Sequence, residues 1–179
     1  QMKGLLCLFL VSFFAFSAVV TAEDEIKTFS GGAVYSMTNG APNYVLVSRV
    51  NSSGYLSYVG RYATGGNGVG EVSGSCLTAA DPLLSQGSVR VSECSRYLFV
   101  VNAGSNTLSF FRIGIDDPTE LKLVGVYDTG YDFPTSVSYS PQLRIACVIG
   151  TGAKNGLRCF QVWKSGLLLL PDWDRPTGL

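Results

Sequence analysis

The 179-residue sequence contains no histidine, and this absence excludes several kinds of active site. Neither a Ser-His-Asp triad nor a Cys-His pair can form without histidine, and metal sites with histidine ligands are excluded as well. The cysteines lack the Cys-x-x-Cys spacing of zinc or redox sites, and no Gly-x-Ser-x-Gly segment occurs. The side chains that remain for acid and base chemistry are those of Arg, Asp and Glu.

Charge is also scarce. Only 15% of the residues are charged, and 13 basic residues balance 13 acidic ones. Because no run of Lys or Arg interrupts this balance, the sequence has no electrostatic footprint for nucleic acid or for an anionic membrane. We therefore expect no nucleic-acid partner and no membrane association of the mature chain, and no motif predicts a cofactor or a metal.

The N-terminal residues 1–22 have the pattern of a secretory signal peptide. Lys3 supplies the charged start, residues 4–16 are apolar, and small residues end at Ala22 before an acidic stretch. We predict cleavage after Ala22, a polar lead-in over residues 23–30, and secretion to the extracellular space. An uncleaved membrane anchor is the alternative, although the apolar run is short for one.

The clearest structural pattern is a β-hairpin over residues 96–113. Residues 97–101 and 107–113 are rich in aromatic and β-branched side chains. They flank residues 102–106, whose Gly and Asn tolerate the positive φ that a tight reversal needs. Two strands are therefore predicted here.

The same pattern occurs upstream at residues 34–50, where Asn39 matches Asn102 and Arg49 matches Arg112. It occurs again at residues 144–162, with one residue added in the turn. Each copy is followed by a further apolar run. A repeat of about 45 to 50 residues that carries about four short strands is the signature of a propeller blade.

The repeat predicts an all-β fold, a partial β-propeller of about three four-stranded blades. Its parts are a partial blade 1 at 31–66, a Gly-rich insertion at 67–84, blade 2 at 85–131 and a partial blade 3 at 132–179. The glycines of the insertion fit neither the dinucleotide pattern nor the Walker pattern, so no phosphate loop is expected. Open end blades expose sheet faces, which predicts self-association through their edges.

Four cysteines remain after removal of the signal peptide, and an even number in a secreted chain favours disulfides. In a hairpin, the residue numbers of two directly opposed positions always add up to the same value. A turn at 150–156 therefore places Cys147 opposite Cys159. We predict the pairs Cys147–Cys159 and Cys76–Cys94. The alternative is that the cysteines are buried free thiols.

Asn51 begins an Asn-Ser-Ser sequon directly after the first hairpin. A turn is expected there, and sequons in exposed turns of secreted eukaryotic proteins are acceptors for N-glycans. We predict glycosylation of Asn51.

Four segments together resemble the opening blades of the lactonase-type seven-bladed β-propeller family. They are Gly-Ala-Val-Tyr-Ser-Met-Thr-Asn at 32–39, Asp-Pro-Leu-Leu-Ser-Gln-Gly-Ser at 81–88, Arg-Tyr-Leu-Phe-Val-Val-Asn-Ala-Gly-Ser-Asn at 96–106 and Asp-Phe-Pro-Thr-Ser-Val at 132–137. The family includes secreted 6-phosphogluconolactonase-like and carboxymuconate-cyclase-like proteins. The resemblance covers about residues 32–179, so it implies the N-terminal blades of such a propeller. Seven blades need roughly 300 residues or more, and the chain is therefore either a part of a larger protein or a short form.

The resemblance implies lactone chemistry on sugar acids or aromatic catabolites, performed by acid-base and oxyanion-stabilising side chains around the central channel. No such set matches here residue by residue. The candidates at the channel mouth lie in or before the predicted innermost strands: Gln86, Arg90, Asp132 and Thr135. For each of them the simpler interpretation is that it caps a strand.

Two hypotheses for the function follow. The first is a lactonase-like enzyme, incomplete and inactive as given. The second is a non-catalytic secreted binding module on the same scaffold. A small lactone or a carbohydrate-like molecule is the expected ligand in both.

Overall fold

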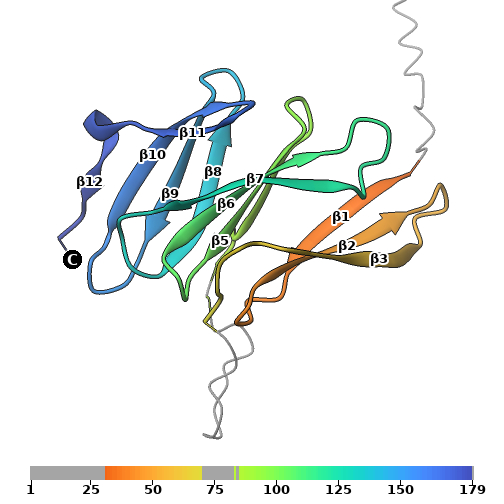
Figure 1. Ribbon diagram of the computed structural model, residues 1–179, viewed down its shortest axis with the longest axis horizontal. Coiled ribbons are helices and arrows are strands. Elements are labelled where there is room, and N and C mark those ends of the chain that lie inside the picture. Colours follow the sequence, from red (N-terminus) through yellow and green to blue (C-terminus); the bar gives the residue numbers. More distant parts are fainter. Residues whose placement is uncertain (1–30, 70–82, 84, 179) are drawn as a thin grey trace, which may run out of the picture.

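The computed structural model describes residues 31–69, 83 and 85–178, whose strands form three antiparallel sheets that stand side by side (Figure 1). The predicted signal peptide, the lead-in and most of the Gly-rich insertion lie outside these residues. Within them, no helix has the length and the apolar character needed to cross a membrane.

Each sheet is a meander in which strands that follow one another in sequence also pair, except that β12 (Arg175–Pro176) pairs with β10 (Gly156–Trp163). The first sheet has the order β1 (Gly32–Met37), β2 (Tyr44–Val50), β3 (Leu56–Ala63). The second has the order β4 (Val89–Ser92), β5 (Tyr97–Asn102), β6 (Thr107–Ile113), β7 (Leu121–Asp128). The third contains β8 (Pro134–Ser140), β9 (Ile145–Gly150), β10 (Gly156–Trp163), β11 (Gly166–Leu169) and β12 (Arg175–Pro176).

This architecture confirms the predicted all-β partial propeller, although only the second sheet has four strands. The first sheet has three strands among the described residues, which correspond to β5, β6 and β7 of the second. The third has five because a 3₁₀ turn at Pro171–Trp173 interrupts its outer strand, so that β11 and β12 pair with β10 separately. A proline cannot donate a ladder hydrogen bond, which explains the interruption.

The registers show that the first two sheets are true repeats. The β2–β3 ladder has a bulge after Val47 and the β6–β7 ladder has one after Phe110, 63 positions later (110 − 47).

The match of Asn39 to Asn102 was wrong by one residue. Thr38 donates its N–H to Tyr44 across the first turn, so Thr38 occupies the place of Asn102 and that turn is one residue longer.

The second sheet is buried on both faces, and every residue of β5 is buried. One face turns Phe99, Phe110 and Tyr97 toward the third sheet, and the other turns Leu98 and Phe111 toward the first. The rings of Phe99 and Phe110 stack with centroids 5.1 Å apart and an interplanar angle of 10°. These contacts stack the three sheets as neighbouring blades.

The same pair of hydrogen bonds occurs at the end of the first sheet and at the end of the second, where the chain passes to the next sheet. The backbone N–H and Oγ1 of Thr64 both donate to the carbonyl oxygen of Asn43, at 3.1 and 3.0 Å. The same atoms of Thr129 donate to the carbonyl oxygen of Asn106, at 3.0 and 2.8 Å. Because all of these groups bond within the fold, the similar segments around the two threonines are structural.

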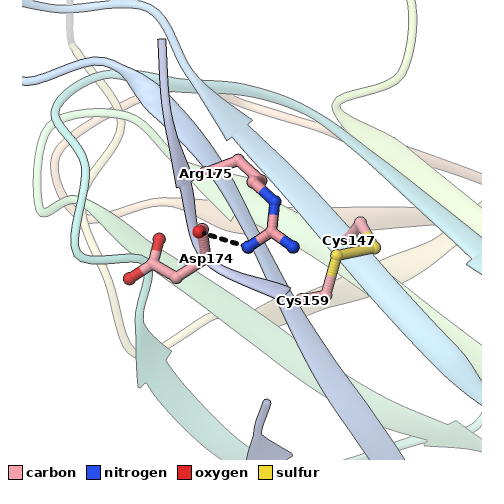
Figure 2. The surroundings of a disulfide bond; sticks show 4 residues. All are labelled: Cys147, Cys159, Asp174 and Arg175. Carbon is pink, nitrogen blue, oxygen red and sulfur yellow. Dashed lines mark hydrogen bonds between the residues drawn. A yellow bond between two sulfur atoms is a disulfide. The ribbon is translucent and has the colours of Figure 1, made fainter. Parts of the chain in front are cut away.

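The disulfide Cys147–Cys159 joins β9 to β10, as the constant-sum register predicted (Figure 2). The two cysteines face each other in the third sheet as Phe99 and Phe110 do in the second. Cys94 is exposed and has no disulfide partner among the described residues, while Cys76 lies outside them. The pairing of Cys76 with Cys94 stays a prediction.

Replacing both Cys147 and Cys159 with Ser should lower the free energy of unfolding by about 2–3 kcal/mol. The bond closes a loop with a sequence separation of 12, and loops of about 15 residues gain roughly 3 kcal/mol from such a cross-link. Urea unfolding of the oxidised proteins measures the difference. With a reducing agent present, the curves of the two proteins should coincide; a gap that persists would show that the cysteine side chains act through packing instead.

Asn51 lies in an exposed turn, where its Oδ1 accepts hydrogen bonds from the backbone N–H groups of Ser53 and Tyr55, both at 3.0 Å. No described group bonds its Nδ2, which is the atom that carries an N-glycan. Glycosylation of Asn51 stays a prediction that this geometry permits.

Candidate functional site

The four residues predicted at the channel mouth differ in exposure and in contacts. Gln86 and Arg90 are exposed, and Thr135 is buried with its carbonyl oxygen accepting a hydrogen bond from the Ser85 hydroxyl. Among the described residues, no hydrogen bond or ion pair joins any two of the four.

Asp132 has a structural role in this arrangement. Its carboxylate accepts hydrogen bonds from Asn106 Nδ2 at 3.0 Å and from the backbone N–H of Lys154 at 2.9 Å. It thereby braces the β9–β10 turn against the second sheet. A catalytic role for any of the four residues stays a prediction.

A cavity of about 800 Å³ lies between the second and third sheets, at the opposite end of the strands. It is formed by the β4–β5 turn, the β6–β7 connection, the β8–β9 turn and the β10–β11 turn. We call it the basic cavity because its charged residues are five cations and one acid: Arg96, Arg112, Lys122, Arg144, Lys164 and Glu120.

The charge of the basic cavity is not neutralised by the protein. Five cations and one carboxylate give it a net charge of +4 (5 − 1) in a chain whose total charge is zero. The ion pairs of the described residues are Arg49–Asp117 and Arg158–Asp174, and neither involves a cavity residue. A concave site of one charge sign concentrates ions of the opposite sign.

Arg112 lies directly beside a second cation of the cavity. In the sheet it is directly opposite Tyr97 of β5 and Lys122 of β7. Two like charges that face each other across neighbouring strands are destabilising. Burial raises the pKa of the Tyr97 hydroxyl, while the positive charges of Arg112 and Arg144 act in the opposite direction.

Two of the five cations are held by the fold, and three are free to bind. Arg96 Nη1 donates to the carbonyl oxygen of Gly114 at 2.6 Å, and the Arg144 guanidinium lies 5.3 Å from the centre of the Trp163 ring. The other three cations have no hydrogen bond or ion pair within the described part of the chain: Arg112, Lys122 and Lys164.

The length of one connection explains why this cavity is open. The β6–β7 connection, residues 114–120, leans on the first sheet, where Tyr35 and Tyr62 donate their hydroxyls to the carbonyl oxygens of Pro118 and Thr119. The corresponding β10–β11 turn consists of residues 164 and 165 alone. The interface between the first and second sheets, here called the first interface, is therefore covered at this end of the strands. The interface between the second and third sheets, the second interface, is left hollow. Figure 1 shows the long connection beside β1.

An ion pair completes the closure of the first interface. Arg49 Nη2 donates to Asp117 Oδ2 at 2.6 Å and to Thr119 Oγ1 at 2.9 Å. Hydrogen bonds from the Thr119 hydroxyl and backbone N–H, together with Arg49, lower the pKa of Asp117 from 3.8 to about 2.

This lowered pKa predicts a dependence of stability on pH. A carboxyl whose pKa falls on folding contributes stability above its unfolded pKa, and that contribution is lost as the pH drops through the folded value. We expect the melting temperature to fall between pH 4 and pH 2 and to fall less in Asp117→Asn. Thermal unfolding across this range measures both proteins, and equal pH slopes would contradict the assignment.

Comparison with known proteins gives similarity at the level of fold. No family model matches the sequence, and no curated protein matches it. The structure is similar to that of a Lactobacillus plantarum protein, with a TM-score of 0.57 and 20% identity over 83% of this chain and 43% of that one. It is also similar to the periplasmic gluconolactonase PpgL of Pseudomonas aeruginosa, with a TM-score of 0.54 and 18% identity over 83% of this chain and 40% of that one.

The chain spans about two fifths of the length of these solved structures. The fold of the lactonase-type propeller expected from the sequence is therefore supported, and a lactonase-like protein is among its structural neighbours. At such low identity the likeness shows the fold alone, and activity has to be argued from the site.

Proposed function

We propose that this chain binds a small anionic ligand of the sugar-acid class on a lactonase-like propeller scaffold. The observation that supports this proposal is the basic cavity, where three cations lack any partner among the described residues. Hydrolysis of a lactone leaves a carboxylate, so a cationic site on such a scaffold fits the acid form of the compounds that lactonases handle. Cationic side chains bind carboxylates by charge-assisted hydrogen bonds.

Binding has more support than catalysis. Hydrolysis of a lactone needs a base that activates water and groups that stabilise the developing oxyanion. The cations of the basic cavity suit the second task, but Glu120 is the one carboxylate there, and its side chain is exposed. Lactone hydrolysis is the second candidate function, favoured by the similarity of fold to a periplasmic gluconolactonase.

We also propose that the protein functions outside the cytoplasm. The Cys147–Cys159 disulfide supports this location, because disulfides persist in oxidising compartments. The periplasmic location in the name of one structural neighbour agrees with it.

Calorimetric titration with gluconate and with glucose tests the proposal. The two probes are similar in size, but only gluconate is charged. We expect gluconate to bind, glucose not to bind, and the affinity for gluconate to fall as salt is added, since the cavity cations are exposed. Equal binding of both probes, or of neither, would refute the proposal. Release of acid from gluconolactone above the spontaneous rate would favour the second candidate.

A further inference from the structure

We infer that Arg112 binds the anionic group of the ligand, which takes the place that an aspartate fills at the neighbouring interface. The inference rests on the proposed function and identifies the residue and the chemical group involved. Its basis is the internal repeat, which presents the same interface twice. One copy is closed by an ion pair, and the other has no ion pair among the described residues.

The first step is the equivalence of Arg49 and Arg112. They lie 63 positions apart (112 − 49), the same offset that separates the register shifts after Val47 and after Phe110. Arg49 reaches from the first sheet to the second, and Arg112 lines the cavity between the second sheet and the third. Both arginines therefore point from the same strand of a blade toward the next blade.

The second step is the partner that each arginine meets. Arg49 is bound by Asp117 and Thr119, both from the β6–β7 connection of the next sheet. The corresponding connection of the third sheet is the β10–β11 turn, which brings Lys164 to the cavity that Arg112 lines. This short turn has no residue that corresponds to Asp117, and its charged residue at the cavity is a lysine.

The third step concerns the residues that lie opposite each arginine on the two neighbouring strands. Arg49 is directly opposite the neutral residues Ala33 and Ser57. Arg112 is directly opposite Tyr97 and Lys122. The second interface therefore gathers positive charge where the first one neutralises it. A bound anion between these cations would offset their repulsion.

The chemistry of the ligand group follows from these residues. A planar guanidinium matches the two oxygens of a carboxylate or phosphate, and lysines add point charges beside it. The anionic group of the ligand is thus a terminal carboxylate or phosphate, with Lys122 and Lys164 on its flanks. Tyr97 and Tyr139, which also line the cavity, are buried with their rings packed against each other, so they bound the site from below.

The substitution Lys164→Asp tests this inference, because it places a carboxylate in the turn that corresponds to the connection carrying Asp117. We expect the new carboxylate to pair with Arg112, the affinity for gluconate to fall by about tenfold or more, and the melting temperature to rise. Lys164→Gln, which removes the charge and supplies no acid, should weaken binding less and leave the melting temperature lower than in Lys164→Asp. Arg61→Asp makes the same change of charge on β3 of the first sheet, away from the cavity, and should bind gluconate as the wild type does.

Calorimetry with gluconate and with inorganic phosphate, and thermal unfolding of the four proteins, separate the outcomes. Wild-type binding that survives Lys164→Asp unchanged would overturn the inference and leave the proposed function intact. Wild-type protein that binds neither probe would overturn the proposed function, and the inference with it. Competition between the two probes, both lost in Lys164→Asp, would support a single anion position.

Discussion

We expect Phe110→Ala to lower the free energy of unfolding by about 3–5 kcal/mol, the largest effect of any single substitution considered for this chain. The Phe110 side chain is fully buried between the second and third sheets. It stacks on Phe99 and meets the edge of the Tyr97 ring, with centroids 5.1 and 5.0 Å away. Truncation removes these contacts and leaves a cavity where two blades meet.

Domains of this size have roughly 5–15 kcal/mol of stability in total, so the variant should lose a large fraction of it. Urea unfolding followed by fluorescence measures the loss. Tyr55→Ala is the matched control, since this aromatic side chain is 74% exposed, and its effect should lie within about 0.5 kcal/mol. Similar losses in the two variants would contradict the stacking of the second sheet on the third.

The second large effect concerns binding. We expect Arg112→Ala to weaken gluconate binding by about 10- to 100-fold, because a hydrogen bond to a charged group contributes about 1.5–3 kcal/mol and each 1.4 kcal/mol changes affinity tenfold. Stability should not fall, since Arg112 is exposed and faces another cation, Lys122. Calorimetry and thermal unfolding of the same samples separate binding from folding.

Arg112→Lys is the informative companion variant. It keeps the positive charge and loses the planar fork that matches a carboxylate. Its affinity should lie between those of the wild type and Arg112→Ala. If Arg112→Ala binds gluconate as tightly as the wild type does, the anion lies elsewhere in the cavity or outside it.

The strands could be predicted from the sequence because their signals are local. Alternating apolar residues and turn residues identified the hairpins, and the sum rule for opposed residues placed Cys147 opposite Cys159. The predicted match of Asn39 to Asn102 was wrong by one residue. The first turn has an extra residue between Thr38 and Tyr44, and the apolar pattern of the flanking strands does not reveal it. The division of the outer strand at Pro171 was also not predicted.

The basic cavity could not be predicted in the same way, because its cations come from three turns and two strands that are far apart in sequence. The predicted innermost strands, which the propeller repeat favours as the site, contain residues such as Asp132, whose carboxylate braces a turn. One signal was present in the repeat. Arg49 and Arg112 occupy the same place in the repeat. The third sheet has no connection as long as the one that supplies Asp117. This difference in length leaves a cavity only because the sheets stack, which the sequence does not show.

A crystal structure of the protein soaked with gluconate tests the central claim most directly. We predict the ligand between the second and third sheets, with its carboxylate against the Arg112 guanidinium and beside Lys122 and Lys164. Gluconate bound at the opposite end of the strands, near Arg90 and Thr135, or an empty basic cavity at a gluconate concentration that saturates binding in solution, would contradict the account.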